Sequence, residues 1–90
     1  MDKIEKDGYY VIDINGMLND VSTRYLIKVN AIHEDGAVGY FMPMTQYDGV
    51  DSLNEFVGGK RPTSGFFKFM DIFSCRKVSP AEAQSILINN

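Results

Sequence analysis

Side chains suited to covalent catalysis or metal binding are scarce in this sequence. It holds one cysteine, Cys75, one histidine, His33, and no tryptophan. A lone cysteine cannot form an internal disulfide, and two ligands are too few for a structural zinc site, which needs about four. A single thiol and a single imidazole well separated in sequence give no reason to expect a nucleophile paired with a base. We therefore expect no enzyme, no metal site and no cofactor.

Long hydrophobic runs are also absent. No apolar stretch approaches the roughly 20 residues of a membrane helix, and residues 1–7 alternate acidic and basic side chains with no apolar signal region behind them. We therefore expect a cytoplasmic protein that does not cross a membrane. The 90 residues, 44% hydrophobic and 23% charged, suit a single domain spanning 1–90. Without a disulfide, its stability must come from packing, which can include a subunit interface.

Charge is unevenly distributed along the chain. Residues 1–59 carry four basic and ten acidic side chains, whereas residues 60–77 carry five basic side chains and one acidic. The net charge is −3, which disfavours binding to a nucleic acid. A basic patch on an acidic protein can still attract a small anion.

Alternating apolar residues predict a first strand over Tyr9–Ile14, ended by a turn at Asn15-Gly16. A hairpin is predicted over residues 23–44, with Asp35-Gly36 as its two loop residues. That loop sets the register, pairing Ile27 with Met44, Val29 with Met42 and Ala31 with Tyr40. It predicts that one face of the hairpin enters the core, through Tyr25, Ile27, Val29, Ala31, Tyr40 and Met42.

The second half predicts a short helical turn, a bent strand and a terminal helix. Ser52–Glu55 has the pattern of a capping box, in which a serine and a glutamate cap the first turn of a helix. A strand region over 66–78 should bend near Met70–Ile72, because Phe66-Phe67 and Phe69-Met70 break the alternation; this indicates a bulge or burial on both faces.

The terminal helix should begin with Ser79 as N-cap and Pro80 as its first residue. Ala83, Ile86 and Leu87 form its apolar stripe. The fold class is thus α+β: four or five strongly bent antiparallel strands with one short helical turn and a C-terminal helix. Such a sheet can curl into a partly open SH3-like barrel, a likeness of strand order and spacing only.

One segment has the composition of an anion site. Its glycines allow close backbone approach, its lysine and arginine supply charge, and its threonine and serine supply hydroxyl donors. Its spacing is not that of a P-loop, and a solvated loop is the simpler interpretation. The candidate ligand-binding residues are Gly58, Gly59, Lys60, Arg61, Thr63, Ser64 and Phe66.

Two functions remain open on these grounds. One is a non-catalytic protein that sequesters or senses a small anionic ligand of the phosphorylated, nucleotide-like kind, as a homo-oligomer with a pocket between subunits. The other is a protein-interaction module, such as a phage-type inhibitor of a host protein, that binds through an acidic face, a sheet edge or patches of methionine and aromatic residues.

Overall fold

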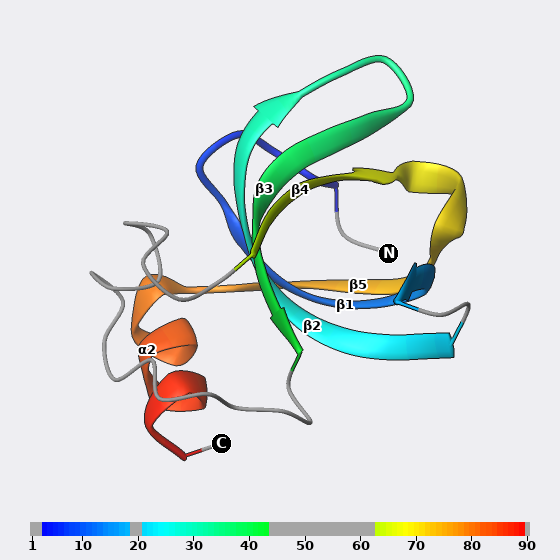
Figure 1. Cartoon of the computed structure of the whole chain (residues 1–90). Helices are drawn as coiled ribbons and strands as arrows, with labels where there is room; N and C mark the ends of the chain where they lie inside the picture. Colours follow the sequence, from blue (N-terminus) through cyan, green and yellow to red (C-terminus); the bar gives the residue numbers. More distant parts are fainter. Residues whose placement is uncertain (1–2, 19–20, 44–62, 90) are drawn as a thin grey trace.

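The computed structural model describes residues 3–18, 21–43 and 63–89. The described residues form five strands and a helix (Figure 1). They are β1 (Tyr9–Leu18), β2 (Val21–Ile32), β3 (Gly36–Pro43), β4 (Thr63–Lys68), the 3-10 turn η1 (Phe69–Asp71), β5 (Ile72–Val78) and α2 (Pro80–Asn89). The capping box predicted at Ser52–Glu55 lies outside the described residues.

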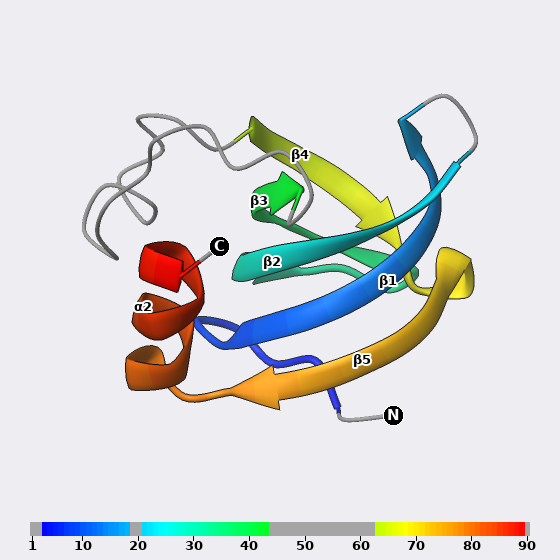
Figure 2. The same cartoon turned by 90° about the horizontal axis from the view of Figure 1, so that it is seen from below.

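All five strands belong to one antiparallel sheet, in the order β4-β3-β2-β1-β5. The strands are strongly curved, and β4 and β5 form the two edges (Figure 2). No ladder within the described residues pairs β4 with β5, so the sheet is open. The α+β class and the antiparallel sheet are confirmed, whereas an SH3-like barrel stays a prediction.

The first strand has the predicted faces but a different end. Tyr10, Ile12 and Ile14 all point into the main core. The turn predicted at Asn15-Gly16 is wrong, because β1 continues to Leu18, past a register shift that follows Ile14. The register shift accommodates the irregular sequence after Ile14, and β1 continues to pair with β2 beyond it.

The hairpin exists, but its predicted register is wrong. Ile32 faces Ala37, and the His33 N–H donates to the Gly36 carbonyl at 2.8 Å, so residues 33–35 form the connection. The prediction assumed that Gly36 supplies a turn conformation. Instead Gly36 lies in β3, where a Cβ would overlap the Phe67 carbonyl oxygen, so this glycine allows β4 to approach closely.

The register error changes which side chains enter the core. Tyr25, Ile27 and Val29 lie in the main core as predicted. A register shift between Val29 and Ala31 inserts one residue into β2, which reverses the side-chain alternation beyond it. Ala31 is therefore only half-buried, outside the buried core. Tyr40 and Met42, also predicted for the main core, belong to the cluster on the opposite face.

Two apolar clusters lie on the two faces of the sheet. The main core lies on one face of the sheet, and the second cluster joins the other face to Ala83 and Leu87 of α2. The main core consists of Tyr10, Ile12, Ile14, Tyr25, Ile27, Val29, Ala37, Phe41, Phe67, Ile72 and Cys75. The second cluster consists of Val11, Leu26, Met42, Val78, Ala83 and Leu87.

The terminal helix begins as predicted. The Glu82 N–H donates to Ser79 Oγ at 3.0 Å, so Ser79 caps the first turn. The Glu82 carboxylate pairs with Arg76 at 2.6 Å. Ala83 and Leu87 are fully buried against the sheet, with Ile86 partly buried beside them.

The bend predicted near Met70–Ile72 is confirmed, but the strand region predicted over 66–78 consists of two separate strands, and the first of them begins at Thr63. η1 occupies Phe69–Asp71, and it separates two strands that pair at opposite edges of the sheet. No helix among the described residues is long and apolar enough to span a membrane.

Candidate interaction site

Most of the predicted anion segment lies outside the described residues. This is true of Gly58, Gly59, Lys60 and Arg61. Thr63 and Ser64 begin β4, where they pair with Phe41 and Tyr40, and their side chains are not described. Phe66 lies on β4 with its side chain exposed. The anion cradle therefore stays a prediction.

The described residues form a pocket elsewhere, at the end of the sheet where β2 turns into β3. Its volume is about 520 Å³, within the usual range for sites that hold a drug-sized molecule. Four of the seven lining side chains are apolar, and three are charged or titratable. They are Ile4, Ile32, Phe69 and Ile72, with Lys3, His33 and Glu34. We call this hollow the turn–η1 pocket.

Backbone hydrogen bonds fix the walls of the pocket relative to one another. The Phe69 N–H donates to the Asp35 carbonyl at 3.0 Å, which ties η1 to the β2–β3 turn. Directly beside this bond, Gly36 pairs with Lys68 in the β3–β4 ladder. The turn and η1 therefore form one structural unit.

The third wall is the segment before β1, and a buried tyrosine holds it. Tyr10 Oη accepts from the Glu5 N–H at 2.7 Å and donates to the Lys3 carbonyl at 3.1 Å. The Asp7 N–H also donates to the Val29 carbonyl at 2.8 Å. These bonds lay Ile4 against the main core, so the wall is anchored at several points.

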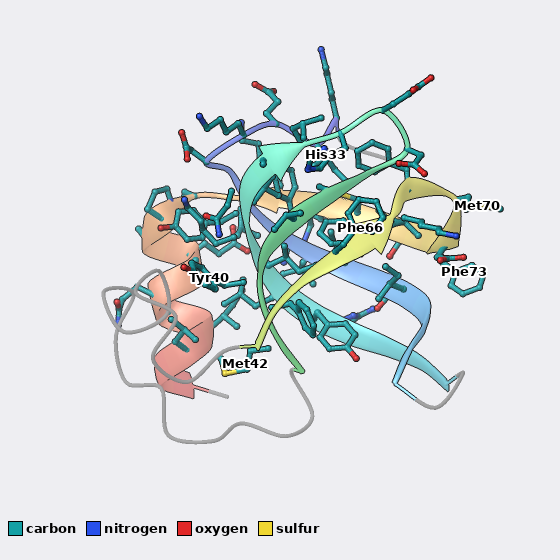
Figure 3. All side chains as sticks on the ribbon, turned by 45° about the horizontal axis from the view of Figure 1, so that its top comes forward. His33, Tyr40, Met42, Phe66, Met70 and Phe73 are labelled. Carbon is teal, nitrogen blue, oxygen red and sulfur yellow. The ribbon has the colours of Figure 1, made fainter. Side chains whose placement is uncertain are left out.

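Beside the pocket, large apolar side chains project into solvent. Met70 is 83% exposed, Phe73 65%, Phe66 46% and Ile32 42%, and these are the exposed large hydrophobics among the described residues. Figure 3 shows Met70 and Phe73 pointing outward near η1, with Phe66 nearer to His33. Single exposed apolar residues are ordinary, but a group of them marks an interaction site. We call Ile32, Phe66, Met70, Phe73 and the pocket the η1 surface.

Phe66 is held in its exposed position by its neighbours. Its ring meets the His33 ring edge-on, with centroids 6.0 Å apart and an interplanar angle of 64°. Gly36 lies under the ring, and a Cβ there would come within 2.6 Å of Phe66 Cζ. The aromatic side chain is thus packed on the turn, which lowers the entropy cost of binding a partner.

Charges of both signs lie on the elements around the pocket. Glu34 and Asp35 are on the turn and Asp71 is on η1, while Lys3 and Lys68 supply positive charge. Because acidic and basic groups are mixed, the electrostatic potential around the pocket is not of one sign. Apolar contact is therefore the main attraction that this region offers a partner.

A separate polar cluster spans three strands away from the pocket lining. Asp13 accepts hydrogen bonds from Arg24 Nε at 2.8 Å and from Ser74 Oγ at 2.7 Å. These bonds, that of Arg24 first, hold the pKa of Asp13 below its ordinary value. Asp13 lies opposite both Arg24 and Ser74 in the ladders, so the cluster links β2, β1 and β5.

The two side chains best suited to nucleophilic catalysis have different environments. Cys75 is buried in the main core, and His33 is exposed on the turn. Among the described residues, no group of three or more histidine, cysteine, aspartate or glutamate side chains could hold a metal ion. What the η1 surface offers is shape and apolar contact.

Sequence reasoning found only Phe66 among the members of this surface. It missed Ile32, Phe69, Met70 and Phe73 as binding residues, although the bend it predicted near Met70–Ile72 overlaps η1, which contains Phe69 and Met70. The signal is the broken alternation at Phe66-Phe67 and Phe69-Met70, which predicts a bulge or burial on both faces. Exposure at η1 is an alternative reason for the same pattern.

No family model matches the chain, and neither curated proteins nor solved structures give a significant match. The fold and the site define a small α+β domain with a preformed pocket inside an exposed apolar surface.

Proposed function

We propose that this protein is a non-catalytic interaction module that binds a partner protein through the η1 surface. The observation that carries the proposal is the exposure of Met70 and Phe73 directly beside the turn–η1 pocket. Methionine and aromatic side chains are enriched where proteins bind one another. A cytoplasmic location is part of the proposal.

The exposed side chains favour a protein partner over a small ligand. A small molecule in the pocket would cover Ile32 and Phe69 but would leave Met70 and Phe73 in water. A protein surface can fill the pocket and cover these projecting side chains together, which removes more apolar area from solvent. The proposed site therefore extends beyond the pocket.

Binding of a small phosphorylated anion by residues 58–65 remains an independent prediction. Calorimetric titration with inorganic phosphate and nucleotides should show binding that Arg61→Ala weakens about tenfold or more. The absence of heat with every anion would rule that site out and would leave the η1 surface unaffected.

Photocrosslinking in the producing cell tests the proposed function. A benzophenone amino acid at position 70 should give a discrete protein adduct, because this side chain would lie inside the interface. The matched control carries the same group at Ala81, an exposed position on α2, at the opposite end of β5 from η1 (Figure 1). Phe73→Glu on the position-70 protein should abolish the adduct. Equal adducts from positions 70 and 81, or none from position 70, would contradict the proposal.

A further inference from the structure

We infer that the segment before β1, residues 3–7, is a strap that opens and closes independently of the sheet and thereby controls access to the turn–η1 pocket. The strap supplies two of the residues that line the pocket, Lys3 and Ile4, so its position decides whether that wall is in place. The regulatory role rests on the proposed function, because the pocket is part of the proposed site. The motion itself needs no partner.

The strap buries little apolar surface. Lys3, Glu5, Lys6 and Asp7 are exposed, and Ile4, which packs against the main core, is itself only half-buried. Apolar burial is the main source of stability, so a segment held in this way has a low free energy of opening. The strands that carry the main core bury their apolar side chains almost completely, and their free energy of opening is therefore much higher.

The polar contacts of the strap are weak, and its backbone is strained at one residue. Asp7 pairs with Lys28 at 3.2 Å and Glu5 pairs with Lys77 at 3.9 Å. Both carboxylates are exposed, so water and salt screen these ion pairs. Asp7 also has a φ of 68°, in the left-handed region that residues with a side chain seldom adopt. The closed strap must offset the cost of that conformation.

The hydroxyl of Tyr10 acts as the latch that keeps the strap closed. Tyr10 is fully buried, and its Oη accepts from the Glu5 N–H at 2.7 Å and donates to the Lys3 carbonyl at 3.1 Å. A buried hydroxyl without partners is costly, so the closed strap is favoured over a partly detached one. When the strap opens, both partners leave together, and the hydroxyl becomes available to water or to a group that enters the pocket.

The other walls of the pocket do not depend on the strap. The Phe69 N–H donates to the Asp35 carbonyl, and Gly36 pairs with Lys68 in the β3–β4 ladder. Neither contact involves residues 3–7, so the turn and η1 stay together when the strap opens. Opening therefore removes one wall and exposes Ile72, which lines the same hollow and is 8% exposed when the strap is closed.

Hydrogen exchange followed by NMR on the full chain tests the motion. The Glu5 and Asp7 amides should share one free energy of opening, lower than that of the Ile27 amide in the central strand β2. Tyr10→Phe removes the latch and should speed exchange at Asp7 about tenfold, because two hydrogen bonds are lost, although the Asp7 N–H does not itself bond to Tyr10. Tyr25→Phe, which removes another hydroxyl from the same core, should leave exchange in the strap unchanged.

Two results of this experiment would overturn the inference. An Asp7 amide that Tyr10→Phe does not affect would show that the hydroxyl holds no cooperative unit. Strap amides that exchange with the same free energy of opening as Ile27 would show that the strap opens only when the whole protein unfolds.

Asp7→Pro tests whether the strap controls the pocket. Proline fixes φ at about −65°, so it cannot adopt the φ of 68° that the closed strap requires, and it lacks the N–H that donates to Val29. Asp7→Asn is the matched control, because it also removes the charge but keeps the N–H and tolerates a positive φ. With a soluble paramagnetic nitroxide as probe, the Ile72 methyl signal should relax faster in the proline variant than in the asparagine variant. The Leu87 methyl, on the opposite face of the sheet, should relax equally in both.

Equal relaxation of Ile72 in the two variants would show that the strap does not control the pocket. A rise at Ile72 and Leu87 together would show that strap and sheet open as one unit, and either result overturns the inference. Neither measurement uses a partner, so these failures leave the proposed function standing. Failure of the crosslink from position 70 would contradict the proposed function and would leave the motion of the strap intact.

Discussion

Gly39 of β3 lies against the backbone of Lys28 on β2, with no room for a side chain. A Cβ at Gly39 would overlap the Lys28 carbonyl oxygen and come within 3.1 Å of the Val29 Cα. Both neighbours are backbone atoms of the central strand, so neither can move without disturbing the sheet. This close approach occurs next to the register shift between Val29 and Ala31, where the hairpin changes which face its side chains occupy.

Gly39→Ala should therefore destabilise the protein by about 1–3 kcal/mol, the usual cost of forcing extra atoms into a packed site. Gly65→Ala is the matched control, because its Cβ would meet only the ring edge of Phe41, at 2.9 Å, and that ring can shift. Urea denaturation of both variants measures the difference. Equal midpoints for the two variants would show that the Gly39 contact is not a constraint.

Ile27→Ala should remove about 2–5 kcal/mol of stability, because Ile27 is fully buried in the main core and its loss leaves a cavity. For a small domain this is a large share of the total stability. Ile32→Ala provides the control, since that side chain is 42% exposed and should matter much less to folding. The experiment compares denaturation midpoints, and similar losses at the two positions would contradict the assignment of faces on β2.

The cap of α2 gives a third prediction. Ser79→Ala removes the oxygen that accepts the Glu82 N–H and should cost about 1 kcal/mol. Ser79→Asp keeps an acceptor at the helix N-terminus and should remain close to the wild type. Thermal unfolding of the Ser79→Ala and Ser79→Asp variants measures the effect. Equal stability of the two variants would disprove the prediction.

The Asp13 cluster predicts a pH dependence of stability. Arg24 and Ser74 lower the pKa of Asp13 in the folded protein from its ordinary value of 3.8. The cluster therefore adds stability above that ordinary pKa, and this contribution is lost as the pH falls through the lower pKa of the folded state. Asp13→Asn cannot titrate, so its stability should fall less steeply with acid in this range. Urea midpoints measured from neutral pH downward test this, and parallel curves for the two proteins would refute it.

The sequence predicts well those parts of the fold that local interactions determine. Ser79 and Pro80 determine where α2 begins, because they cap its first turn. This capping pattern is local, so it can be identified from the sequence without knowledge of the tertiary fold. Tyr10, Ile12 and Ile14 alternate along an uninterrupted strand, so their face follows from the period of a strand. The bend at η1 was also predictable, because Phe69-Met70 interrupts the pattern.

Features that depend on contacts between distant segments were not predictable. Gly36 resembles a turn glycine, yet its absent side chain makes room for the Phe67 carbonyl oxygen on β4. The register shift near Ala31 arises where β2 and β3 pair, and no local pattern marks it. Exposure of Met70 and Phe73 is likewise a property of the assembled sheet, since the same residue types usually form the core.

The central claim is that the η1 surface is where this protein meets another protein, and methionine methyl NMR tests it most directly. Met70 and Met42 serve as probe and internal control, because Met70 is exposed at η1 and Met42 is buried between the sheet and α2. Met70→Leu and Met42→Leu assign the two signals. When the protein crosslinked from position 70 is added to the wild type, the Met70 methyl signal should shift or broaden, the Met42 signal should stay in place, and Phe73→Glu should abolish the change at Met70. A Met70 signal that is unaltered by the protein crosslinked from position 70, or equal changes at Met70 and Met42, would contradict the account.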